Sequence, residues 1–435
     1  MLRHLLRKSL FAGVLLTLIL SVQVAAAQTL SGTITVLSHR TDLDQDGTLA
    51  RYSEEFKALY PDLTVNWETI TDYAGEVATR LNTTDYGDVL NIPPAVSPDK
   101  FPEFFSPLGT VEELGAKYNF INEGAYDGTV YGVATTGNAN GLLYNKEVFE
   151  AAGITDLPTT PEEFLADLKL IKDNTDAIPL YTNYHAGWAL TQWNPGIEAF
   201  SGDPDYVNLK MPHMDAPFAE GEPIYMSYKL LFDAVQNGYT EADPTTTDWE
   251  QSKNLIAQGD IAVMALGSWA IVQMQDAAEA IGKDRSIIGY MPYPTTVDGK
   301  QYAGAGGDYK IAVNKNSPNQ EIAKAFLTWF LEDSNFAFDQ GGIPPLIDAE
   351  LPANYDAFAK AGVTYVVDTP SIAGEEGLLN NIDKEAEIGW NNGSGLWQST
   401  VIDAARGQIS ESFDDLMNDA NTKWAEARKA LEVTP

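Results

Sequence analysis

Few kinds of side chain in this sequence are equipped for covalent or acid–base catalysis, although carboxylates are abundant. The 435 residues include no cysteine and four histidines, against 62 aspartates and glutamates. There is no Gly-x-Ser-x-Gly elbow, no His-Glu-x-x-His pair and no phosphate-binding loop, the usual motifs of serine hydrolases, zinc proteases and nucleotide hydrolases. Two suitably spaced carboxylates are enough for glycoside hydrolysis, so a secreted carbohydrate-active enzyme stays open as an alternative.

One acidic loop has the pattern of the first half of a calcium-binding loop. Asp42, Asp44 and Asp46 alternate along the chain and are followed by Gly47, as at the start of an EF-hand loop. The twelfth position, where a bidentate glutamate sets the affinity, is Ser53. We therefore interpret the segment as a solvated acidic turn before a helix, with calcium binding as the alternative, and expect no metal ion and no cofactor.

The N-terminus predicts export from the cytoplasm. Arg3, Arg7 and Lys8 precede an apolar run over residues 10–20, which ends at three alanines, 25–27. This order is typical of a secretory signal peptide cleaved after Ala27, and the apolar run is shorter than the roughly 20 residues that a membrane span needs.

The composition excludes several classes of partner. Removal of residues 1–27 takes away three basic residues and moves the formal charge from −35 to −38. Such an acidic chain is not expected to bind nucleic acid or an anionic membrane, both of which require positive charge. Without cysteine the chain has no disulfide, no thiolate metal site and no cysteine for a lipid anchor.

Segments that favour strands and helices alternate along the mature chain. Residues 33–37 and 63–67 alternate in polarity, residues 88–92 precede two prolines, and residues 261–266 form an apolar run, which predicts four strands. Helical periodicity and capping residues predict helices, which we place over 49–59, 161–171, 249–258, 320–330 and 413–431. This alternation indicates an α/β fold of parallel sheets flanked by helices.

Three short stretches rich in glycine or small polar residues interrupt this pattern, at 135–141, 304–307 and 341–345. Each is too short for a flexible linker, so we interpret them as three crossings of the chain between two lobes. Each lobe would then consist of discontinuous pieces of sequence.

A series of short motifs gives the sequence a family resemblance. They occupy residues 56–61, 86–89, 126–132, 143–149, 157–164, 258–264 and 267–269. With these motifs in this order, the mature sequence resembles the bacterial extracellular solute-binding proteins of carbohydrate ABC transporters over nearly its whole length.

The resemblance implies the two-lobed periplasmic-binding-protein fold of type II, with a mainly parallel sheet flanked by helices in each lobe. Proteins of this class close about a hinge when they bind a ligand. By this resemblance the N-terminal lobe spans residues 28–138 and 305–344, and the C-terminal lobe spans residues 139–304 and 345–435.

The resemblance also places aromatic ligand contacts in the C-terminal lobe. Trp269 ends a Gly-x-Trp motif directly after a buried strand, and ligands favour the carboxyl ends of strands. Trp390 and Trp397 flank a glycine-rich turn, and either one could stack on a sugar while the other packs in the core. The segment after the strand-like residues 178–182 adds three candidates, of which the last could equally be a structural group: Tyr184, Trp188 and His185.

In the N-terminal lobe the expected ligand contacts are polar. Related proteins bind sugar hydroxyls with charged side chains of the loop after the first strand, and charge-assisted hydrogen bonds are about twice as strong as neutral ones. The candidates are Arg40, Asp42 and Asp44 of that loop, Asn91 at the end of the third strand, Asp308 beside the second crossing, and Tyr73.

The sequence thus predicts a receptor of an ABC importer that binds a mono- or oligosaccharide between its lobes and delivers it to the permease without chemistry on the ligand. We expect a monomer, free in the periplasm and not lipidated. One alternative is the secreted enzyme named above. Another is a receptor for a non-sugar ligand such as glycerol phosphate, which would need a cationic pocket.

Overall fold

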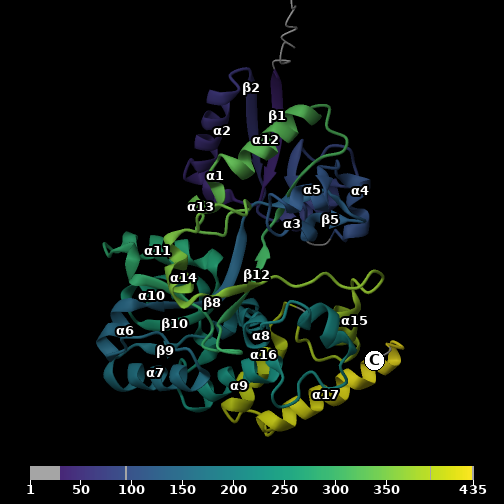
Figure 1. The fold of residues 1–435 in the computed structure, drawn as a ribbon. Helices are drawn as coiled ribbons and strands as arrows, with labels where there is room; N and C mark the ends of the chain where they lie inside the picture. Colours follow the sequence, from purple (N-terminus) through teal and green to yellow (C-terminus); the bar gives the residue numbers. More distant parts are fainter. Residues whose placement is uncertain (1–29, 94–95, 392, 434–435) are drawn as a thin grey trace, which may run out of the picture.

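The computed structural model describes residues 30–93, 96–391 and 393–433, so the predicted signal peptide lies outside the described residues. Figure 1 shows two lobes, one above the other, with strands β8 (Gly137–Asn145) and β12 (Tyr302–Gly307) running between them. Among the described residues, no helix combines the length and the apolar character needed to cross a membrane.

The N-terminal lobe is built on a five-stranded sheet in the order β2-β1-β3-β13-β7. Its strands are β1 (Gly32–Ser38), β2 (Leu63–Thr69), β3 (Val89–Asn91), β7 (Gly132–Ala134) and β13 (Lys310–Val313). Strand β1 is parallel to β2 and β3, whereas β13 is antiparallel to β3 and β7. Strand β13 reaches this sheet from the other lobe, which is why its direction is reversed.

Helices cover both faces of this sheet. On one face α2 (Thr48–Leu59) and α12 (Gln320–Glu332) bury Tyr52, Phe56 and Phe326 against the sheet. On the other face lie α3 (Tyr73–Arg80) and α4 (Phe101–Phe104). Shorter elements complete the lobe: α1 (Thr41–Gln45), α5 (Val111–Gly115), α13 (Phe336–Asp339), β4 (Gly109–Thr110), β5 (Ala125–Tyr126), β6 (Thr129–Val130), η1 (Pro98–Lys100) and η2 (Ile121–Gly124).

The C-terminal lobe contains a sheet in the order β14-β12-β8-β10-β9, with β11 also paired to β8. Its remaining strands are β9 (Ile178–Leu180), β10 (Ile261–Gly267), β11 (Ile288–Met291) and β14 (Thr364–Val366). Side chains of one strand alternate between two cores, as the period of a strand requires: Val263 and Ala265 enter one, Met264 and Leu266 the other.

The two faces of this second sheet carry different helices. The core that holds Met264 lies under α10 (Trp249–Gln258), α11 (Ile271–Ala280) and α14 (Asp356–Ala361). The larger core that holds Val263 lies under α6 (Lys146–Ala152), α7 (Pro161–Asn174), α8 (Gly196–Ser201), α9 (Pro223–Gln236), α15 (Leu378–Glu385), α16 (Leu396–Ala405) and α17 (Phe413–Ala430). Short 3-10 and π turns connect them: η3 (Tyr184–Ala186), η4 (Trp188–Trp193), η5 (Tyr206–Lys210), η6 (Met211–His213), η7 (Pro244–Thr246), η8 (Ser268–Ala270), η9 (Arg285–Ile287) and η10 (Ala353–Tyr355).

The predicted strand directions were wrong in one respect. Both sheets are mixed rather than mainly parallel. In the second sheet β8 is antiparallel to β10, β11 and β12, and only β9–β10 and β12–β14 are parallel. The reversal again comes from strands that enter from the other lobe. The predicted strands and helices themselves lie within a few residues of the observed ones.

The three predicted crossings lie side by side and hydrogen-bond to one another. Gly137 of β8 pairs with Gly307 of β12. Gly137 also exchanges two backbone hydrogen bonds of 2.7 Å with Ile343 of the third crossing. The lobes are therefore connected through one short, backbone-bonded band of chain.

Candidate ligand-binding site

The polar face of the crossing strands forms the centre of the candidate site. Strand β12 pairs Gly306 with Asn138 of β8, and continuing this register brings Gly304 opposite Asn140. On its other side Asn140 pairs with Gly267 of β10. Residues opposite each other in antiparallel strands point to the same face, so Gly304, Asn140 and Gly267 form one row across three strands, which we call the glycine row.

Glycine at both ends of this row leaves room that other groups occupy. A Cβ on Gly267 would lie 2.5 Å from Nε1 of Trp269 and 3.5 Å from Oε1 of Gln192. A Cβ on Gly304 would lie 3.3 Å from Cδ of Glu198 on α8. With strands about 4.8 Å apart, the indole and the carboxyl stand about 10 Å from each other above the row.

Trp269 belongs to a cluster of three tryptophans. Its ring centroid lies 5.8 Å from that of Trp188 and 5.8 Å from that of Trp249, and the last two are 5.1 Å apart. Trp188 is 37% exposed and the other two are partly buried. The three elements that carry them, η4, α10 and η8, thus present an aromatic surface beside the glycine row.

The N-terminal lobe contributes a second cluster, at the carboxyl ends of β1 and β3. The His39 ring lies 4.3 Å from that of Tyr309 and 5.9 Å from that of Tyr73. The Tyr73 hydroxyl donates to the carbonyl of Asn91 (2.9 Å) and accepts from its N–H (2.7 Å), and the Asn91 side chain meets Nδ1 of His39 at 3.2 Å. Burial lowers the pKa of His39 to about 4, against the opposing effect of Asp308, so the imidazole is neutral at pH 7.

A chain of hydrogen bonds connects the two clusters. Nδ2 of Asn138 donates to Asp308 (3.3 Å), and Oδ1 of Asn138 accepts from the Ser268 hydroxyl (3.3 Å). Ser268 directly precedes Trp269, and Asp308 directly precedes Tyr309. The aromatic surface of one lobe and the polar cluster of the other therefore meet at the crossing strands.

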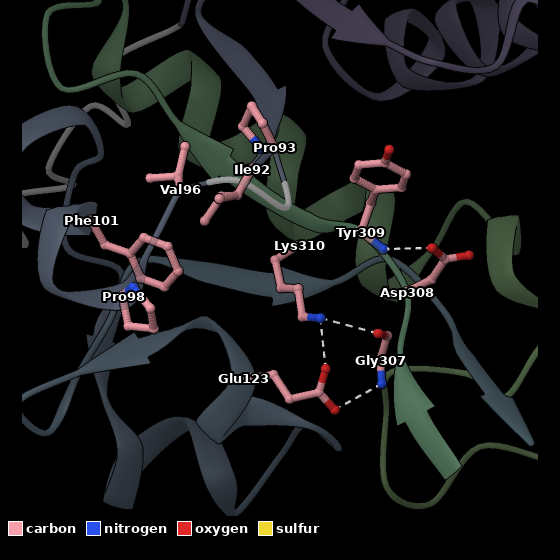
Figure 2. A pocket seen from close by; sticks show the side chains of 10 residues that line it. All are labelled: Ile92, Pro93, Val96, Pro98, Phe101, Glu123, Gly307, Asp308, Tyr309 and Lys310. Carbon is pink, nitrogen blue, oxygen red and sulfur yellow. Dashed lines mark hydrogen bonds and ion pairs between the residues drawn. The ribbon is translucent and has the colours of Figure 1, made fainter. Parts of the chain in front are cut away.

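A cavity of about 430 Å³ opens beside this junction on the N-terminal side, shown in Figure 2. Apolar side chains, including Ile92 and Phe101, form one wall. On the other, Lys310 pairs with Glu123 at 2.6 Å, and Glu123 accepts the Gly307 N–H at 2.8 Å. A larger cavity of about 680 Å³ lies at α6 and α14 and is lined by none of the predicted ligand contacts.

The charged loop after β1 is engaged in contacts of its own. Arg40 forms a salt bridge with Asp42 at 2.6 Å and donates to Gln340 at 2.7 Å. Asp44 accepts from Thr69, and Asp46 accepts the Thr48 N–H. The segment predicted as a loop contains the short helix α1. Within the described part of the chain, no three His, Asp or Glu side chains are grouped so that they could hold a metal ion.

The expectation that Trp390 or Trp397 faces a ligand does not agree with the structure. Trp390 is 2% exposed and Trp397 is 6% exposed, and both belong to the large core of the C-terminal lobe. The ring of Trp397 lies 5.6 Å from that of Phe218 and 6.2 Å from that of Tyr228. The glycine-rich turn between the tryptophans leads into α16, whose apolar face carries Trp397 inward.

The remaining candidates of the C-terminal lobe lie in η3 and η4. The Tyr184 hydroxyl donates to Asp403 of α16 at 3.0 Å, so it is bonded within its own lobe. The His185 side chain is exposed, and its backbone N–H donates to Thr247. Of these three candidates, Trp188 is the one whose ring lies next to that of Trp269, at 5.8 Å.

Several residues of the site were missed at the sequence level. They are His39, Glu123, Asn138, Asn140, Gln192, Glu198, Trp249 and Tyr309. Asn138 and Asn140 stand in the stretch recognised as a crossing, and their alternation with Gly137, Ala139 and Gly141 was the available signal for a strand with one polar face. The others are single residues far apart in the chain, which only the fold brings together.

This two-lobed fold, with a polar and aromatic site at the chain crossings, defines a class of extracellular binding protein. The family model of bacterial extracellular solute-binding proteins matches residues 41–335, and the chain belongs to this family. Its fold is the type II solute-binding fold of the structures described next.

Two solved structures are similar over almost the whole chain. One is a manno-oligosaccharide-specific solute-binding protein, BlMnBP2 of Bifidobacterium animalis subsp. lactis, in complex with mannotriose. It is 42% identical, with a TM-score of 0.80, over 92% of this chain and 95% of that chain. The other, BlMnBP1 of the same organism, is a binding protein of an ABC transporter in complex with mannobiose. It is 43% identical, with a TM-score of 0.80 and the same coverage.

A curated relative is more distant. The diacetylchitobiose-binding protein DasA of Streptomyces coelicolor is 28% identical over 281 residues, which are 62% of this chain. The match spans about 63% of the length of that protein.

Proposed function

We propose that this protein is the extracytoplasmic receptor of an ABC importer, which binds a mono- or oligosaccharide between its lobes and delivers it to the permease. It acts as a monomer and performs no chemistry on its ligand. The predicted signal peptide, and a sequence in which no cysteine offers a site for a lipid anchor, support a free, non-lipidated protein of the periplasm.

The observation that carries this proposal is the pairing of a partly exposed indole with a glycine-lined polar strand face. A sugar has an apolar C–H face, which packs on an aromatic ring, and hydroxyls, which need polar partners. Trp269 offers the first, and Asn138, Asn140 and Asp308 offer the second within the same hydrogen-bonded band.

The relatives support an oligosaccharide of the mannose series as the ligand. The two structures that share 42% and 43% identity with this chain hold mannotriose and mannobiose. With one sugar unit placed over the glycine row, the 430 Å³ cavity near Lys310 would leave room for a second. Mannobiose and mannotriose are therefore the first probes.

A carbohydrate-active enzyme is disfavoured by the carboxyl groups at the site. Glu198 and Asp368 lie within hydrogen-bond reach of each other. Retaining glycosidases hold their two carboxyl groups about 5–5.5 Å apart and inverting ones about 6.5–9.5 Å apart. A pair in direct contact leaves no room for a glycosidic bond between its members.

A phosphorylated ligand such as glycerol phosphate is also disfavoured. Such a ligand needs an available cation, and charge-assisted contacts to phosphate come from Arg or Lys. The nearest described cations are already bound, Lys310 to Glu123 and Arg40 to Asp42. Glu198 and Asp368 add acidity rather than positive charge.

We further propose that the lobes comprise residues 28–138 with 305–344 and residues 139–304 with 345–435, so that each boundary falls in a crossing. Closure about these crossings would bring the His39 cluster toward Trp269. Ligand affinity would then depend on how much better the closed state binds than the open one.

The test is a thermal-shift and calorimetric screen of the purified mature protein against mannobiose, mannotriose, other oligosaccharides and glycerol phosphate. Reaction mixtures are analysed in parallel for sugar products. The proposal predicts stabilisation by at least one sugar that is recovered unchanged. Turnover of a sugar, or binding of glycerol phosphate alone, would refute it.

A further inference from the structure

Two carboxyl groups in the C-terminal lobe stand beside the glycine row without a basic partner. The side chain of Glu198 packs against Gly304. A Cβ added to Gly304 would lie 3.2 Å from the Cβ of Glu198 and 3.3 Å from the Cδ of Glu198. Asp368 follows β14, which runs parallel to β12 with Val366 opposite Gly304. Asp368 therefore lies farther along β12, toward Gly306. Glu123 points to the same place, because a Cβ added to Gly306 would lie 3.6 Å from Oε1 of Glu123.

Two oxygen atoms of this pair have unmet hydrogen-bonding capacity. Oε2 of Glu198 and Oδ1 of Asp368 are buried, and no donor group of the described residues lies within hydrogen-bond distance of either. The two carboxyl groups do lie within reach of each other. A hydrogen bond between two carboxyls requires a proton on one of them, so the pair is stable as one acid and one carboxylate.

The surroundings favour this half-protonated state. Burial and the charge of Asp368 raise the pKa of Glu198, and burial together with Glu123 raises the pKa of Asp368, against the hydrogen bond from Glu198. The other titratable groups that act on the pair are Tyr228 and Tyr293. The Tyr228 hydroxyl is bonded to Asn194, and that of Tyr293 to the carbonyl of Gln192.

The shared proton satisfies one of these oxygens and leaves acceptor capacity on the carboxylate. A buried acceptor without a donor destabilises a protein, so this capacity calls for a partner. The pair flanks one end of the glycine row, and Trp269 flanks the other, about 10 Å away by strand spacing. One pyranose ring, lying over Asn140 with a face toward the indole, would bring its hydroxyls to the carboxyl groups.

We propose that Glu198 and Asp368 are specificity-determining residues of the sugar site, which are held together by their one proton and accept hydrogen bonds from ligand hydroxyls through their remaining oxygen lone pairs. This inference rests on the proposed sugar-binding function. A pair that keeps one negative charge is suited to a neutral ligand, whose hydroxyls can donate to it. An anionic sugar would be repelled by the remaining charge.

The test combines substitutions in the protein with deletions in the ligand. Calorimetry measures affinity for mannobiose and its monodeoxy analogues. It compares the wild type with four variants: Glu198→Gln, Glu198→Ala, Asp368→Ala and the control Glu241→Gln. Glutamine keeps the shape of a protonated glutamate, with an NH₂ donor group in place of the acid O–H and one carbonyl acceptor. Glu241 is a buried carboxyl of the same lobe that is bonded to Thr182, away from the glycine row.

We expect both alanine variants to bind mannobiose at least ten-fold more weakly, Glu198→Gln to bind it more tightly than Glu198→Ala does, and the control Glu241→Gln to stay within about three-fold of wild type. For at least one deoxy analogue, the loss of affinity seen in the wild type should vanish in Glu198→Ala or Asp368→Ala, because the deleted hydroxyl has already lost its partner. A purely structural role would lower affinity for all analogues by the same factor.

Equal sensitivity of the wild type and both alanine variants to every deoxy analogue would overturn the inference. Unchanged affinity in both alanine variants would overturn it as well, while leaving the sugar-receptor function intact. A wild type that binds no sugar would instead refute the proposed function itself, so the two failures are distinguishable.

Discussion

Replacing Trp269 by alanine is expected to weaken sugar binding by about ten-fold or more. Its Nε1 edge lies over Gly267, and two other indoles pack against it at 5.8 Å, so a ligand has access to only part of the ring. A desolvated aromatic anchor of this kind contributes about 1–3 kcal/mol, and each 1.4 kcal/mol corresponds to a factor of ten.

Isothermal titration with mannotriose measures this change directly. The matched control is Trp67→Ala, which removes an indole from β2 in the N-terminal lobe, where it packs on Phe326 and Phe330. Both variants lose stability, but only Trp269→Ala should lose affinity. In thermal-shift experiments at a fixed sugar concentration well above Kd, a ten-fold weaker affinity lowers the ligand-induced stabilisation by about 1.4 kcal/mol.

The assignment of Trp269 as a ligand contact would be refuted by a Trp269→Ala variant that binds its sugar as tightly as wild type. It would also be refuted if Trp67→Ala lost affinity by the same factor, since the effect would then reflect general loosening of the fold. Either result would move the ligand away from the glycine row.

Three further predictions concern the packing and charge of the site. Gly267→Ala should weaken binding at least ten-fold, because its Cβ would sit 2.5 Å from Nε1 of Trp269 and displace the ring, whereas Gly115→Ala in α5, with an ordinary 3.4 Å contact, should not alter titrations. Trp397→Ala should lower the free energy of unfolding by about 3–5 kcal/mol, measured by urea denaturation, while the folded protein keeps its sugar affinity. For His39, whose pKa is lowered to about 4 by burial, the unfolded state binds more protons between pH 6.5 and 4. Stability should therefore fall by up to about 1.4 kcal/mol per pH unit on acidification through this window, and a His39→Gln variant should lack that part of the pH dependence.

Local signals in the sequence were sufficient for most elements. The helix predicted over 249–258 coincides with α10, which is capped by Asp248 and ended by Gly259 at a φ of +95°. Thr160 accepts the Glu163 N–H at the start of α7, as its capping pattern predicts. These features depend on neighbours within four residues, which is why periodicity and caps revealed them.

Strand direction and residue exposure depend on partners far along the chain. The local sequence of residues 302–307 does not show whether this strand is parallel or antiparallel to its neighbours. Those neighbours, β8 and β14, are about 168 and 62 residues away in sequence. Trp390 and Trp397 carry the same local signature as a ligand-facing aromatic, yet both are buried in the large core of their lobe, Trp397 on the inner face of α16. For the same reason Trp249, inside a correctly predicted helix, gave no sign that it would meet Trp269.

The glycine row lies partly on the crossing strands, so the same residues belong to the connection between the lobes and to the candidate site. Residues 304–307 were interpreted as a crossing because they are small, and the structure adds that the lack of side chains also leaves space for Glu198 and Glu123 on one face. Asn138 bonds Asp308 of the second crossing at 3.3 Å, and it also accepts from Ser268, which directly precedes Trp269. A ligand on this face would contact the very strands through which the lobes are joined. Its binding energy would thus act on the crossings directly, without needing a separate relay from the site to the hinge.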